Sequence, residues 1–153
     1  MVVPGSYQVR LIAAGTTETQ PLTVRFDPRV ARDGVTLVDL REQLQHNIKV
    51  RDMVTEVNQL AVSIEEGRAR LRTATSAADT LKMLEDLRAK VIMPNVRYSK
   101  PELQSHIQYL YSMTMQADQK IGRDAITRYA KLRQELDDRI VEAKKLLGTR
   151  VAM

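Results

Sequence analysis

The chain contains no cysteine and no tryptophan, and only one of its 153 residues is phenylalanine. Without thiols it can form neither a disulfide nor a thiolate metal site. Aromatic residues make up 4% of the chain, which argues against a nucleic-acid surface built on exposed stacking rings. The core must then consist of aliphatic side chains and methionine, as is typical of helices that pack on helices.

Long apolar runs are also missing, so we expect no membrane span. Residues 1–4 lack the basic start and the apolar middle of a signal peptide, and we expect a cytoplasmic location for the chain expressed as it stands. The net charge is +5, but both signs are dispersed along the sequence. We therefore expect no nucleic acid as partner. The alternative is a basic helical module that binds nucleic acid or an anionic surface through Arg68, Arg70, Arg72, Lys82, Arg88 and Lys90.

The longest periodic stretch runs from Thr36 to Arg72 and predicts a single helix. Its apolar residues recur mostly three or four positions apart, which is the period of one helical face. Thr36 and Asp39 have the spacing of a capping box, in which a hydroxyl and a carboxylate satisfy the first free amides. Because so long a helix is unstable alone in water, we expect other helices to cover its apolar stripe.

Three further helices are predicted downstream. The first has Ser76 and Asp79 at capping spacing and stops before Pro94, the second follows Pro101, and the third stops at Gly148. The inner positions of the last helix are predicted to be Ile126, Tyr129, Leu132, Leu136, Ile140 and Leu147. These lengths indicate a four-helix, up-and-down antiparallel bundle, with a three-helix coil that has a bent third member as the alternative.

Residues 4–29 predict a β-hairpin with one apolar face. The turn contains Gly15, which can adopt a positive φ, and Pro21 cannot donate to a ladder, which places it at an edge or an irregularity. The alternating apolar residues are Tyr7, Val9, Leu11, Leu22, Val24 and Phe26. A lone hairpin is marginal in water. Its apolar face must therefore cover the helices, pair with another chain, or belong to a larger sheet.

The hairpin stretch, PGSYQVRLIAAGTTETQPLTVRFDPR, carries a resemblance to a known family. It resembles the end of the immunoglobulin-like segment that follows sortilin-like, BNR-repeat β-propellers in bacterial exported proteins, which are often labelled glycosyl hydrolases. Residues 105–139 also resemble the closing helices of that family. The resemblance implies that the chain is the C-terminal accessory region of a periplasmic or extracellular protein. The propeller is absent, so no hydrolase activity carries over to these residues.

The sequence contains no recognisable catalytic, cofactor or metal motif, and we expect neither an enzyme nor a bound cofactor. His46 and His106 lack partners at metal-ligand spacing, and we interpret both as surface or packing histidines. The acidic pairs Glu65–Glu66 and Asp137–Asp138 point about 100° apart on a helix, so they are not converging dyads.

Two further groups of residues have alternative interpretations. Tyr109 and Tyr111 lie two positions apart on a helix and cannot both face one core, so we expect one ring to reach the surface or the hairpin as an interdomain contact. The charged residues Asp118, Lys120, Arg123 and Asp124 cluster at the last helix break. We interpret them as charged caps that flank a turn, with a ligand site as the alternative.

The sequence thus predicts a mainly α chain with a hairpin over 1–29, a linker over 30–35, a helical bundle over 36–148 and a tail over 149–153. We expect a non-catalytic structural or interaction module that mediates interdomain packing or oligomerisation. Its partner would be the upstream propeller or sandwich, or a second copy in a homodimer. The candidate interaction residues are Tyr7, Val9, Leu22, Val24, Phe26, Tyr109 and Tyr111.

Overall fold

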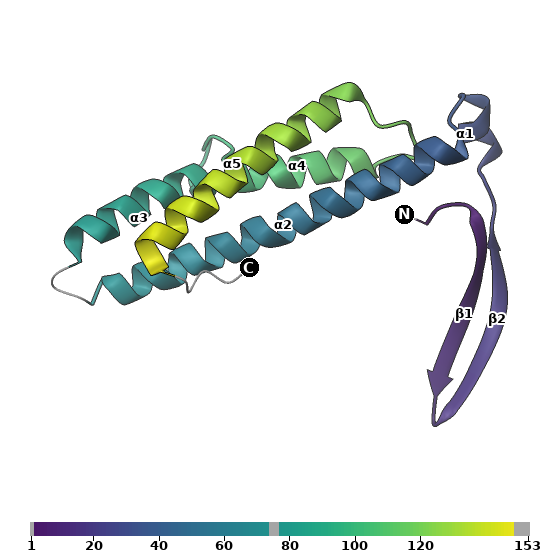
Figure 1. Ribbon diagram of the computed structural model, residues 1–153, viewed down its shortest axis with the longest axis horizontal. Helices are drawn as coiled ribbons and strands as arrows, with labels where there is room; N and C mark the ends of the chain where they lie inside the picture. The colour runs from purple at the N-terminus through teal and green to yellow at the C-terminus, as the bar shows by residue number, and fades with distance from the viewer. Residues whose placement is uncertain (1, 74–76, 149–153) are drawn as a thin grey trace.

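The computed structural model describes residues 2–73 and 77–148 and shows an antiparallel helical bundle with an N-terminal β-hairpin (Figure 1). The predicted fold class is therefore confirmed. The elements in chain order are β1 (Gly5–Ala13), β2 (Thr16–Val24), α1 (Pro28–Arg32), α2 (Leu37–Leu71), α3 (Ala78–Val91), α4 (Leu103–Met115) and α5 (Arg123–Leu147). Two expectations, the cap at Ser76 and the tail over 149–153, lie outside the described residues.

Helix α2 begins with the predicted capping box. The Asp39 backbone N–H donates to Thr36 Oγ1 at 3.2 Å, and the Thr36 backbone N–H donates to the Asp39 carboxylate at 2.9 Å. These bonds satisfy amides that the first helical turn leaves without partners. The side-chain and backbone hydrogen bonds from Thr36, with help from Lys120, hold the pKa of Asp39 below its ordinary value.

Helices α3 and α4 run in the same direction, one after the other, along the length of α2 (Figure 1). Arg88 of α3 pairs with Glu65 at 2.6 Å, and Gln104 of α4 bonds Asn58 at 2.9 Å. Helix α5 then returns parallel to α2 (Figure 1). The bundle therefore consists of three rods: α2, then α3 and α4 end to end, and then α5. The four helices therefore do not alternate up and down as the sequence suggested. The broken rod is the second and not the third, because the chain at Pro94 leaves the helix without reversing direction.

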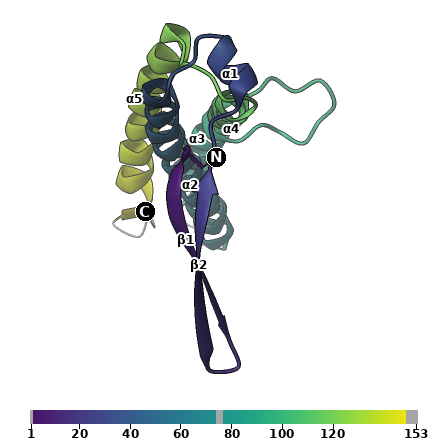
Figure 2. The same cartoon turned by 90° about the vertical axis from the view of Figure 1, so that its right-hand side faces the viewer.

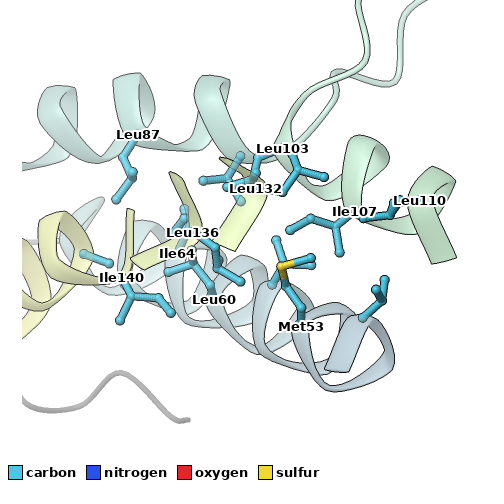
Figure 3. Packing of buried hydrophobic residues seen from close by; sticks show 14 of the residues in the cluster. Met53, Leu60, Ile64, Leu87, Leu103, Ile107, Leu110, Leu132, Leu136 and Ile140 are labelled. Atoms are coloured by element: carbon cyan, nitrogen blue, oxygen red, sulfur yellow. The ribbon is translucent and has the colours of Figure 1, made fainter. Parts of the chain in front are cut away.

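The core lies where the three rods meet, and its side chains come from all four long helices (Figure 3). Leu132, Leu136 and Ile140 of α5 are buried there as predicted, and Tyr129 and Leu147 pack against them. Ile126 is 54% exposed, contrary to its predicted inner position. It lies in the first turn of α5, at the end of the bundle where α5 diverges from α2 (Figure 1).

Two buried amide side chains of α2 hold the C-terminal end of α4. Gln43 Nε2 donates to the carbonyl oxygens of Thr114 at 2.9 Å and Ala117 at 2.7 Å, and Gln43 Oε1 accepts from the Gln119 backbone N–H at 3.1 Å. Asn47 Nδ2 also donates to the Thr114 carbonyl at 3.1 Å. These bonds occupy carbonyl groups that the last turn of a helix leaves free, so they fix where α4 ends along α2.

The segment that joins the hairpin to the bundle contains the short helix α1. Its N-cap is Asp27, whose carboxylate accepts from the Arg29 backbone N–H at 2.8 Å. The suggested linker over 30–35 thus holds the second half of this helix and then Gly34, which has a φ of 80°. Glycine adopts this left-handed conformation at little cost, which allows the chain to turn from α1 into α2.

Candidate interaction site

The first candidate site is the hairpin. Strands β1 and β2 pair in antiparallel register and are joined by a two-residue turn at Ala14 and Gly15. Both turn residues have a positive φ, 49° and 78°, as in a type I′ turn, whose twist matches that of the flanking strands. The predicted hairpin and its turn are therefore present.

One face of the hairpin is apolar and lies in solvent. The register places Tyr7 opposite Leu22 and Val9 opposite Gln20, and alternation along each strand adds Leu11 and Val24 to the same face. The exposed fractions of Tyr7, Val9, Leu11 and Leu22 are 40%, 52%, 64% and 47%. Of the other predicted interaction residues, Val24 and Phe26 are half-buried.

The hairpin points away from the helices, as the two views of the chain show (Figures 1 and 2). Both strands are exposed along their length, apart from half-buried Val24 at the end of β2. The apolar face therefore does not cover the bundle, which was one of the three arrangements that the sequence left open. Pairing with another chain and membership of a larger sheet remain.

The two outer edges of the hairpin differ in their hydrogen-bonding groups. A two-residue turn is closed by a hydrogen-bonded pair, and the pairs alternate from there, so Gln8 and Arg10 point their backbone groups away from β2. By the same alternation Thr19 and Pro21 point theirs away from β1. Pro21 has no N–H, so the β2 edge lacks a donor near its middle. The β1 edge keeps its donors and is therefore better suited to receive another strand.

The second candidate site is a groove of about 850 Å³ between α4, α5 and the loop that joins them. Tyr109 and Met113 of α4 line one side, and Arg128 and Lys131 of α5 line the other. Of the predicted charged cluster, the structure brings Lys120, Arg123 and Asp124 to the end of this groove. The sequence could show that these charges are neighbours but not that they border a concave surface.

Tyr109 and Tyr111 have different environments, as their spacing predicts. Tyr109 is 58% exposed and lies in the groove, whereas Tyr111 packs against the core. The hairpin extends away from α4 (Figure 1), so Tyr109 reaches the surface and not the hairpin.

His46 packs against the ring of Tyr129 in an edge-to-face arrangement, with ring centroids 5.7 Å apart. Burial, together with nearby Lys49, lowers the pKa of His46. His106 Nδ1 lies 3.2 Å from an Arg128 guanidinium nitrogen. Among the residues that the structure describes, no three histidine, cysteine, aspartate or glutamate side chains come together as metal ligands would.

Most of the cations proposed for a nucleic-acid surface are bound to carboxylates. Arg68 pairs with Glu85 at 2.6 Å and also with Glu65, and Arg88 pairs with Glu65 at 2.6 Å. Arg72 lies 3.9 Å from Glu85, and Lys90 lies 3.4 Å from Glu142. Such pairing reduces the positive potential that phosphate binding needs, so this face of α2 and α3 is a weak candidate.

Comparisons with family models, with curated proteins and with solved structures find no match to this chain. Over residues 2–73 and 77–148, no helix combines the length and the apolar character that crossing a bilayer requires.

Proposed function

We propose that the chain is a non-catalytic interaction module whose hairpin joins the β-sheet of another protein unit through the edge of β1. The observation that carries the proposal is an apolar face on a hairpin that projects from the bundle with Tyr7, Val9 and Leu11 in solvent. A two-stranded hairpin gains stability when a third strand or a packed layer covers it. Strand addition at a free edge is an established mode of protein recognition.

The partner that we favour is the sheet of an immunoglobulin-like segment, because residues 4–29 resemble the end of such a segment. The chain would then be the C-terminal accessory region of an exported BNR-repeat propeller protein, and the hairpin would mediate packing between its domains. A second copy of the chain could supply the strand in the same geometry and would make the module an oligomerisation element. The non-catalytic part of the proposal rests on the sequence, which contains no recognisable catalytic motif.

A matched pair of proline variants tests which edge is used. Arg10 and Thr19 are directly opposed in the register, and each points its backbone N–H away from the partner strand. Arg10→Pro removes a donor from the β1 edge, while Thr19→Pro removes one from the edge that Pro21 already interrupts. Light scattering over a concentration series, with hydrogen exchange on the same samples, would follow association.

We expect association of the wild type to be lost in Arg10→Pro and kept in Thr19→Pro, with unchanged thermal unfolding of the bundle in both. If the wild type is a monomer whose hairpin amides exchange rapidly, the same two variants would be tested in a longer chain that also carries the proposed immunoglobulin-like segment. A monomer whose hairpin amides are as well protected as those of α2 would refute the proposal, because such a hairpin needs no partner.

A further inference from the structure

The groove between α4 and α5 has two chemically different sides. On α4, Tyr109 and Met113 are 58% and 42% exposed, with Leu110 at the base. On α5, Thr127, Arg128 and Lys131 line the groove, at the spacing of one helical face. A surface that is apolar on one side and cationic on the other, and concave between them, differs from an ordinary solvated helix pair.

The cations of the groove are also less neutralised than most arginines elsewhere on the bundle. Lys120, Arg123, Arg128 and Lys131 face a single carboxylate, that of Asp124. No ion pair to Arg123 or Lys131 is present among the described residues, and Lys120 lies 3.8 Å from Asp39, outside the groove. By contrast, many arginines on the rest of the bundle hold carboxylates at contact distance, as Arg133 holds Glu56 at 2.8 Å.

The shape of the groove strengthens this excess charge. Field lines from cations on the walls of a concavity converge inside it, which raises the local concentration of anions. Helix α5 begins at the same end of the groove, at Gly122, with no side-chain cap bond. The positive end of its dipole adds to the potential of Lys120 and Arg123, and Asp124 in the first turn offsets part of it.

We infer that this groove binds a long-chain carboxylate, with the head group at the Lys120–Arg123 end and the aliphatic tail along Tyr109 and Met113. The volume of about 850 Å³ falls within the roughly 300–1,000 Å³ of small-molecule sites. The concave shape argues against a flat bilayer as the occupant. This inference does not depend on the hairpin, because the groove and the β1 edge belong to different parts of the chain.

Isothermal titration with decanoate, below the concentration at which it forms micelles, tests the inference. Acetate serves as the head-matched control and decyltrimethylammonium as the tail-matched control of opposite charge. The variant Lys120→Gln/Arg123→Gln removes the two cations at the head-group end of the groove. The variant Arg70→Gln/Lys82→Gln removes two exposed cations outside the groove and is its matched control. Circular dichroism melts would establish that both variants fold.

We expect saturable one-site binding of decanoate, much weaker binding of both control ligands, and a chemical-shift change at the Met113 methyl group. The groove variant should weaken decanoate binding about tenfold or more, because it removes charge-assisted contacts to the carboxylate head group. The matched control variant should bind as the wild type does.

Several outcomes would overturn the inference. One is the absence of decanoate binding in the folded wild type, and another is equal binding of decyltrimethylammonium, which would show that only the tail is recognised. If the groove variant and the control variant lose the same affinity for decanoate, the net charge of the protein and not the groove would account for the binding. Binding of polyglutamate or of phosphatidylglycerol vesicles in place of decanoate would make the surface a macromolecular one.

Discussion

In a Gln43→Leu variant, α4 would lose the buried side chain that fastens its C-terminal end to α2. Gln43 is 1% exposed and makes three hydrogen bonds to backbone groups of residues 114–119. Leucine has a similar size, so the change removes hydrogen bonds and opens little cavity. The variant therefore isolates the contribution of this amide to the free energy of unfolding.

The magnitude follows from which groups keep a partner. The Thr114 carbonyl still accepts from Asn47 at 3.1 Å, whereas the Ala117 carbonyl and the Gln119 N–H lose their bonds to Gln43. Each buried group left without a partner costs about 1–3 kcal/mol, but both residues lie in an exposed loop, where water recovers part of that cost. We expect a loss of about 2–3 kcal/mol, or a fall in Tm of roughly 4–12 °C for a chain of this size.

Urea unfolding followed by far-ultraviolet circular dichroism measures this loss. Gln104→Leu is the matched control, because Gln104 Nε2 also bonds across the α2–α4 interface, to Asn58 Oδ1 at 2.9 Å, but on the exposed surface. Its effect should stay within about 0.5 kcal/mol. If Gln43→Leu unfolds at the same urea concentration as Gln104→Leu, the buried amide does not hold α4 and this reasoning is wrong.

Three further predictions use the same unfolding assay. Thr36→Ala should cost about 1 kcal/mol by removing the capping box, and Thr36→Ser should restore most of that loss. Gly67→Ala should be close to neutral, since a helix-propensity gain of about 1 kcal/mol is offset by displacement of Leu147, while Gly67→Val should cost about 1–3 kcal/mol by overpacking. Burial lowers the pKa of His46 below 6.5, so the folded chain favours the neutral imidazole. The stabilisation that neutral His46 gives to the folded chain is therefore complete above pH 6.5 and is lost as the pH falls toward the folded-state pKa. The difference in the free energy of unfolding between wild type and His46→Gln should therefore shrink as the pH is lowered from about 8 to about 5.5. A difference that stays constant over this range would contradict a lowered pKa for His46.

Features set by local chemistry could be predicted from the sequence. Thr36 and Asp39 act within one helical turn, and the apolar period of α2 needs only the geometry of a helix. The turn at Gly15 and the position of Pro21 likewise follow from backbone constraints at single residues.

Features set by contacts distant in the sequence could not be predicted. That α3 and α4 share one direction depends on how each packs against α2, and the loop through Pro94 does not encode it. Gln43 reads as a polar position on a helix, although it bonds a loop more than seventy residues away. The direction of the hairpin, and the groove beside Tyr109, likewise depend on how whole elements are placed.

Residue-resolved hydrogen exchange of the hairpin amides would show whether the chain binds its partner through the edge of β1. In the dilute chain, the amides of Gln8, Arg10 and Thr19 all point outward and should exchange rapidly. When a partner strand binds, through association of the chain or addition of the preceding segment, Gln8 and Arg10 should gain protection while Thr19 continues to exchange. Protection that appears at Thr19 instead, or association that leaves Gln8 and Arg10 exchanging as before, would contradict a module that binds through the edge of β1.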